Sequence, residues 1–133
     1  MIIVEPATLQ DIADIQPLFE RRHWQAMVVQ IARSPSIAVR DFETDQILAI
    51  AGIYPHEVEG RIDHGELWIH FRPGLKASRS APAVVRRLIM LARGLKHITA
   101  IVAEDCAEGL HIARLAGMRE LDRPLPGHIR FMR

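Results

Sequence analysis

Residues 66–82 read ELWIHFRPGLKASRSAP, and this stretch decides the fold that we expect for the chain. Its first part alternates as a strand with two distinct faces does. One face holds Glu66, Trp68 and His70, and the other holds Leu67, Ile69 and Phe71. A loop of small and basic residues follows, and Pro82 is typical of the first turn of a helix. The stretch therefore predicts a strand, a loop and a helix in direct succession.

Toward the N-terminus, three short apolar runs rich in β-branched residues predict strands at 2–4, 37–42 and 47–54. The last two are separated by a polar turn, which indicates an antiparallel hairpin. Between the first two runs, Thr8 is a good N-cap for an amphipathic helix, and Pro17 should kink or end it. A second helix is predicted at 22–33, and a turn is predicted at 60–65 before the strand at 67–71.

Toward the C-terminus, a broad apolar face at 84–95 predicts a helix that stops near Gly94. The continuous apolar run at 98–103 predicts a strand buried on both faces. Residues 107–116 should form the last helix, with Gly117 as its left-handed cap, and 119–121 and 129–132 should form two final strands. At 133 residues the chain should fold as one α/β domain, residues 1–133, with a mostly antiparallel mixed sheet.

Composition excludes several kinds of function. Lys and Arg total 17 against 16 for Asp and Glu, so the net charge of +1 indicates no general attraction to nucleic acid or to membranes. Cys106 is the only cysteine, and the N-terminus has no signal-peptide pattern, so we expect a reducing, cytoplasmic setting. The seven histidines are scattered without ligand spacing, so no metal site is predicted.

The order of elements resembles the GNAT N-acetyltransferase fold over essentially the whole chain. In that family the fourth strand ends in an apolar residue, any residue and Pro, which matches Phe71-Arg72-Pro73. The family's phosphate loop, Arg or Gln, two residues, Gly, one residue, then Gly or Ala, aligns with Lys76-Ala77-Ser78-Arg79-Ser80-Ala81. Gly117-Met118 is similar to the end of the family's last helix. Arg79 stands where the first glycine is expected, and Ala113 stands at the usual tyrosine.

The resemblance implies a three-layer GNAT-like fold with six or seven strands and about four helices. It also implies acetyl-CoA as co-substrate. Backbone N–H groups of such a loop, with the following helix N-terminus, hold a pyrophosphate. The implied coenzyme-binding residues are Phe71, Lys76, Ala77, Ser78, Arg79, Ser80 and Ala81. Arg79 either obstructs the coenzyme or turns its guanidinium toward a phosphate. The alternative is a basic loop that only caps a helix.

Transfer of an acetyl group to an amine needs a group that takes a proton from the amine. Glu66 and His70 share a face of the strand that borders the acetyl group in the family, so both are candidate bases. The alternative for Glu66 is a charged residue at the start of a strand with no catalytic role. The alternative for His70 is a partly buried histidine whose polar group is satisfied by a neighbouring residue. Trp24 and Tyr54 are candidates for the acceptor site. The alternative for Trp24 is a core residue, and the alternative for Tyr54 is an aromatic residue at the rim of the cleft. Cys106 is expected to be a packing residue.

Two classes of function follow from the resemblance. The first is an acyl-CoA-dependent N-acetyltransferase that acts by direct attack of an amine, from a small molecule or a protein, on acetyl-CoA. The second is a catalytically silent GNAT-like domain used for binding or assembly, as in small accessory proteins of phages or prophages. The irregular loop and the missing tyrosine favour the second class. An unrelated α/β module is a third alternative, and a homodimer is a candidate assembly.

Overall fold

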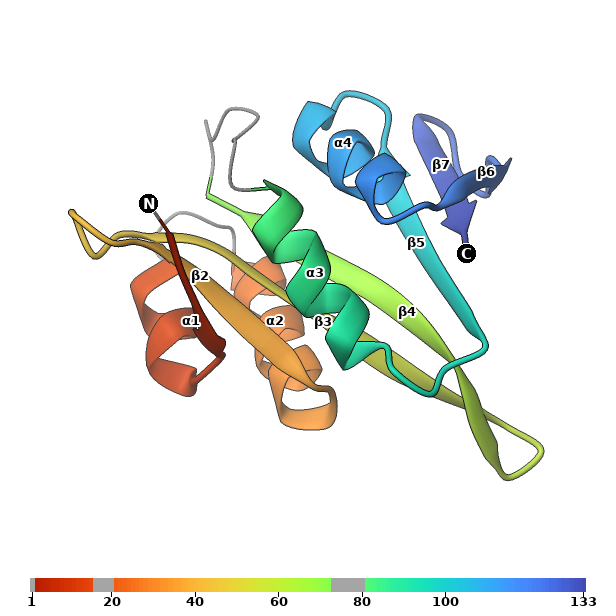
Figure 1. The fold of residues 1–133 in the computed structure, drawn as a ribbon, viewed down its shortest axis with the longest axis horizontal. Helices are drawn as coiled ribbons and strands as arrows, with labels where there is room; N and C mark the ends of the chain where they lie inside the picture. Colours follow the sequence, from red (N-terminus) through yellow and green to blue (C-terminus); the bar gives the residue numbers. More distant parts are fainter. Residues whose placement is uncertain (1, 16–20, 73–80) are drawn as a thin grey trace.

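The computed structural model describes residues 2–15, 21–72 and 81–133, and all of their side chains except those of 22–24 and 58. The described chain forms four helices and seven strands in the predicted order (Figure 1). The helices are α1 (Leu9–Ile15), α2 (Arg21–Arg33), α3 (Ala81–Leu91) and α4 (Ala107–Leu115). The strands are β1 (Ile2–Pro6), β2 (Ser36–Asp41), β3 (Ile47–Val58), β4 (Arg61–Phe71), β5 (His97–Ala103), β6 (Arg119–Asp122) and β7 (His128–Met132).

All seven strands join one sheet in the order β1-β2-β3-β4-β5-β7-β6. Neighbouring strands run antiparallel except β4 and β5, which run parallel. The crossover between these two strands contains α3. The mixed and mostly antiparallel sheet predicted from the sequence is therefore confirmed.

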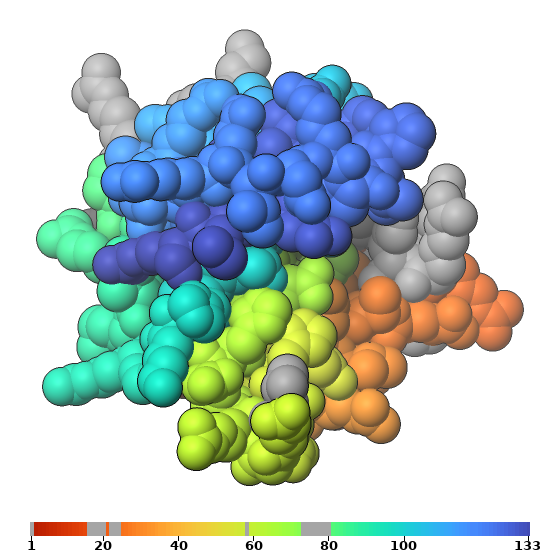
Figure 2. Space-filling view, turned by 90° about the vertical axis from the view of Figure 1, so that its right-hand side faces the viewer, coloured from red at the N-terminus to blue at the C-terminus, as the bar shows by residue number. Residues whose placement is uncertain are grey.

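The β3–β4 hairpin is longer than predicted, and the predicted turn at 60–65 is wrong. Val58 pairs with Arg61, so the turn consists of Glu59 and Gly60 alone. Both residues have positive φ angles, 52° and 76°, as a two-residue turn between twisted strands requires. Residues 61–65 extend β4 instead, and the hairpin projects from the body of the molecule (Figures 1 and 2).

Helices cover the sheet in two groups, which produces three layers. α3 and α4 pack on one face in a cluster that includes Leu67, Leu88 and Phe131. α1 and α2 pack on the opposite face in a second cluster with Met27 and Trp68. Leu67 and Trp68 are neighbours in sequence but belong to different clusters, as the alternation in β4 predicts.

The start of α1 is fixed by Thr8, the N-cap that the sequence predicts, together with Asp11. Thr8 Oγ1 accepts a hydrogen bond from the Asp11 backbone N–H (3.3 Å), and Asp11 Oδ2 accepts one from the Thr8 backbone N–H (2.7 Å). This reciprocal pair caps the helix. Asp11 is buried, and its Oδ1 also accepts from Arg40 Nη2 on β2 (2.7 Å). The cap and the ion pair together attach α1 to the sheet.

Two further expectations need correction. α3 ends at Leu91, about one turn before the stop predicted near Gly94. The strand at 98–103 is not buried on both faces, because Ile101 is 42% exposed. α1 and α2 pack on the part of the sheet formed by β2, β3 and β4, so β5 has a helix over one face only. Among the described helices, none combines the length and the apolar character needed to cross a membrane.

Candidate active site

A cleft opens where β4 and β5 separate. The two strands pair only at His64–His97, Gly65–Ile98 and Glu66–Thr99, and then diverge toward their C-terminal ends (Figure 1). The cavity between them has a volume of about 340 Å³. Residues 66–71 of β4 line one wall and residues 100–103 of β5 line the other.

One side of α4 closes the side of this cleft. Its N-cap residue Cys106 and the helix residues Gly109, Ile112 and Ala113 line the cavity. Gly109 lets α4 approach β5 closely, because a Cβ atom there would lie 2.8 Å from Val102 Cγ1. The cleft therefore has an apolar wall that carries one thiol.

Glu66 lies at the closed end of the cleft, because it is the last residue of β4 that pairs with β5. Its side chain is 41% exposed. Its Oε2 accepts a hydrogen bond from His56 Nε2 on β3 (3.2 Å). A partly exposed carboxylate that borders a cleft is placed to receive a proton from a group bound there.

His70 lies nearer the open end of the cleft, four residues farther along β4. Its Nε2 donates to Gln30 Oε1 on α2 (2.7 Å). Its ring lies beside that of Trp68, with centroids 5.6 Å apart. Four residues of strand span about 13 Å, so Glu66 and His70 serve different parts of the cleft.

Comparison with solved structures places this architecture in a known group. The acetyltransferase of the GNAT family from Streptococcus pneumoniae superposes with a TM-score of 0.73 at 11% identity, covering 100% of this chain and 98% of that one. YncA from Salmonella typhimurium, solved with its cofactor acetyl-CoA, gives 0.76 at 12% identity, covering 99% and 92%. Spermidine N-acetyltransferase from Vibrio cholerae, in complex with CoA and spermine, gives 0.69 at 12% identity, covering 99% and 94%.

This chain has the GNAT fold. The resemblance found in the sequence is thus confirmed at the level of fold, including the seven-stranded sheet and the four helices. The sequence matches no family model and no curated protein.

The GNAT fold brings only some of the predicted site residues into the described cleft. Glu66, His70 and Phe71 line it, and Ala81 is buried as the first residue of α3. The predicted phosphate-loop residues Lys76, Ala77, Ser78, Arg79 and Ser80 lie outside the described residues, as does the side chain of Trp24. Their roles stay predictions.

Tyr54 lies directly across the β3–β4 ladder from Glu66. Its ring is half-buried against the α1–α2 side of the sheet and lies 5.7 Å from the ring of His56. Its role at an acceptor site stays a prediction. Trp68 is buried, and its Nε1 donates to Ser34 Oγ (3.2 Å).

Sequence reasoning missed His56. The residue lies on the extended part of β3, opposite His64 and diagonal to Glu66. A two-residue turn at Glu59-Gly60 would by itself place His56 opposite Asp63. A β-bulge between His56 and Glu57 shifts the pairing by one residue, to His64, and the sequence gives no signal for this bulge.

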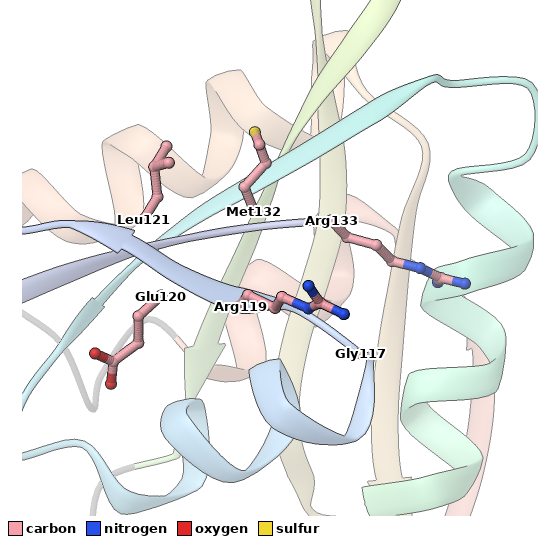
Figure 3. A pocket seen from close by; sticks show the side chains of 6 residues that line it. All are labelled: Gly117, Arg119, Glu120, Leu121, Met132 and Arg133. Carbon is pink, nitrogen blue, oxygen red and sulfur yellow. The ribbon is translucent and has the colours of Figure 1, made fainter.

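A second hollow lies away from the cleft, at the sheet edge formed by β6 and β7 (Figure 3). Its volume is about 460 Å³, and it is lined by Gly117, Arg119, Glu120, Leu121, Met132 and Arg133. Leu121 and Met132 project from one face of the strands, and the Glu120 carboxylate points away from them (Figure 3). This lining contains neither a thiol nor an imidazole. Across the described parts of the chain, no three His, Cys, Asp or Glu side chains gather as metal ligands do.

Proposed function

We propose that the protein is an acyl-CoA-dependent N-acetyltransferase that moves an acetyl group to an amine by direct attack. The observation that supports this most is the cleft between β4 and β5, with the Glu66 carboxylate at its closed end. The GNAT fold supports the same reaction class, since a structural neighbour is described as an acetyltransferase of that family.

The cleft suits acetyl-CoA as co-substrate. Beyond Glu66 and Thr99 the strands no longer pair with each other, so backbone groups along both walls can accept and donate hydrogen bonds. The pantetheine arm contains amides that can add to a strand edge in the same way as a peptide. The apolar residues of α4 would face the thioester end. One structural neighbour was solved with its cofactor acetyl-CoA, and another was solved in complex with CoA.

The proposed reaction needs one proton acceptor and no covalent enzyme intermediate. The amine nitrogen forms a bond to the thioester carbonyl carbon, and the carbon–sulfur bond then breaks. Glu66 takes the proton that the amine loses, directly or through water, and the departing thiolate gains a proton to give CoA. Ala113 lines the cleft where the family places a tyrosine, so this thiolate is protonated by solvent.

The acceptor is proposed as a small-molecule or protein amine. A neighbour with the same fold is named for spermidine and is bound to spermine, which shows that this architecture accommodates polyamines in that protein. A homodimer stays part of the proposal. Leu121 and Met132, 51% and 38% exposed, are the apolar side chains at the sheet edge that a second copy would cover.

Thermal unfolding with acetyl-CoA tests the proposal. At a ligand concentration 100 times its Kd, binding adds about 2.7 kcal/mol to the free energy of unfolding. Adenosine 3′,5′-bisphosphate, which lacks the pantetheine arm, is the control and should raise Tm less. Thiol release from acetyl-CoA in the presence of a panel of amines then measures turnover. An unchanged Tm at millimolar acetyl-CoA would contradict the enzyme and favour a silent binding domain.

A further inference from the structure

We infer that His56 is a positioning residue that fixes the Glu66 carboxylate at the closed end of the cleft. This inference rests on the proposed function of the same cleft. It concerns a residue on β3 that does not line the cavity and that acts only through Glu66.

The geometry places three polar side chains around Glu66 on one face of the sheet. Tyr54 lies opposite it on β3, Thr99 lies opposite it on β5, and His56 reaches it diagonally. In an antiparallel pair a diagonal neighbour is within reach of a long or aromatic side chain. The distance from His56 Nε2 to Glu66 Oε2, 3.2 Å, agrees with that expectation.

The direction of the hydrogen bond follows from the chemistry of the two groups. An ionised carboxylate can only accept, so His56 must carry its hydrogen on Nε2. Both side chains are 41% exposed, so the pair contributes little to stability. Its effect would lie in holding one carboxylate oxygen, which leaves the other oxygen in a fixed direction.

A second histidine, His64, packs its ring near that of His56. The rings of His56 and His64 lie 5.3 Å apart, at an angle of 39°. His64 Nε2 shares a hydrogen bond with Thr99 Oγ1 (2.9 Å) across the short parallel ladder. Both histidine contacts therefore lie where β4 and β5 are still paired, next to the point where they part. A carboxylate held there keeps its place while the open end of the cleft admits ligand.

Two substitutions of His56 test whether it acts by positioning Glu66 or has another role. In His56→Gln the amide nitrogen can replace Nε2 as donor, whereas His56→Leu leaves no donor. We expect His56→Leu to lower kcat about tenfold or more, with an unchanged KM for acetyl-CoA, because small misplacements of a catalytic group cost up to about 100-fold. His56→Gln should recover most of the loss. His111, exposed on α4, provides the matched control pair, His111→Gln and His111→Leu, with wild-type rates.

Three outcomes would overturn the inference. The first is a wild-type kcat in His56→Leu. The second is equal loss in the Gln and Leu variants, which would make the imidazole itself the proton carrier. The third is a further loss when His56→Leu is added to Glu66→Gln, because a residue that acts only through Glu66 has no effect without it.

A structural readout keeps this inference distinct from the proposed function. Crystal structures of wild type and His56→Gln should show one orientation of the Glu66 carboxylate, and that of His56→Leu should show several. A single unchanged orientation in His56→Leu would refute positioning whether or not the protein turns over acetyl-CoA. Absence of turnover in the wild type would refute only the proposed function.

Discussion

Glu66 and Thr99 face each other at the last register pair of the parallel β4–β5 ladder. From this pair onward the two strands diverge, and α4, which follows β5, lines the space that opens between them. The carboxylate is thus placed at the closed end of the cleft by sheet topology.

Replacing this carboxylate should stop most of the reaction. Glu66→Gln keeps the size of the side chain and can still contact His56, but an amide cannot take up a proton. We expect kcat for amine acetylation to fall about 100-fold or more, as loss of general base catalysis does. Acetyl-CoA should still raise Tm as in wild type. A wild-type kcat in this variant would exclude Glu66 as the base.

His70→Gln should have a smaller effect than Glu66→Gln. His70 Nε2 already donates to Gln30 Oε1, and an amide at position 70 can make the same contact. We expect a fall in kcat of less than about tenfold, below the usual range for loss of a general base. If His70→Gln instead loses more activity than Glu66→Gln, the two residues exchange roles in the proposed mechanism.

The single cysteine reports directly on occupancy of the cleft. Cys106 has a free thiol, is half-buried and lines the cavity from the start of α4. Saturating acetyl-CoA should slow its modification by a maleimide severalfold, because the bound coenzyme covers the thiol. Adenosine 3′,5′-bisphosphate should protect it less. Equal modification rates with and without acetyl-CoA, in a sample whose Tm responds to the ligand, would place the coenzyme elsewhere.

Gly52 on β3 should tolerate no side chain. A Cβ atom there would lie 2.5 Å from the Pro35 carbonyl oxygen and 2.7 Å from Trp68 Cζ2. Pro35 contributes a backbone atom and Trp68 a buried ring, so neither can move away without a cost in stability. Gly52→Ala should therefore lower the free energy of unfolding by about 1–3 kcal/mol in urea titrations.

Gly60 provides the control for that substitution. It occupies the β3–β4 turn with φ at 76° and has open space where a Cβ would lie. Asn tolerates this conformation better than most residues, so Gly60→Asn should change stability by less than about 1 kcal/mol. Equal losses in both variants would mean that the packing around Gly52 is not the cause.

The sequence was sufficient for element order because the periodicities of its strands and helices were unambiguous. Alternation in β4 predicted which side chains face each helix layer, and Thr8 predicted the start of α1. The cleft could not be predicted from these periodicities, because it forms where the paired strands β4 and β5 separate. The point of separation depends on the strand register and on how closely α4 approaches β5, and neither can be read from the composition of one segment.

The relative placement of elements also decides which site residues the sequence can predict. Glu66 and His70 were predicted because they share a face of one strand, a property that a single segment reveals. His56 belongs to a different strand, and Gln30 contacts His70 from a helix 40 residues earlier. Contacts of this kind require the relative placement of two elements. The burial expected for 98–103 failed for a related reason, since helices cover the sheet unevenly there.

The ion pair that attaches α1 to β2 makes stability depend on pH. Arg40 donates to both Asp11 and Asp14, and its hydrogen bond holds the pKa of Asp14 below the ordinary value of 3.8. A carboxyl whose pKa is lower in the folded state stabilises the fold above its unfolded pKa, and this contribution is lost as pH falls through the folded value. Wild type should therefore be more stable than Asp14→Asn at pH 6, and the difference should shrink below pH 3.8.

Urea unfolding at pH 6, 4 and 3 measures that difference. Because the Asp14 side chain is 36% exposed, the gain at pH 6 should be small, and it should decrease further in high salt. Asp11 is buried and also accepts from the Thr8 backbone, so Asp11→Asn should cost more than Asp14→Asn at the same pH. In an Arg40→Gln background the effect of Asp14→Asn should shrink, because only the hydrogen bond from Gln10 then remains. A difference between wild type and Asp14→Asn that persists unchanged at pH 3, or that is as large in Arg40→Gln as in wild type, would show that Asp14 does not act through Arg40.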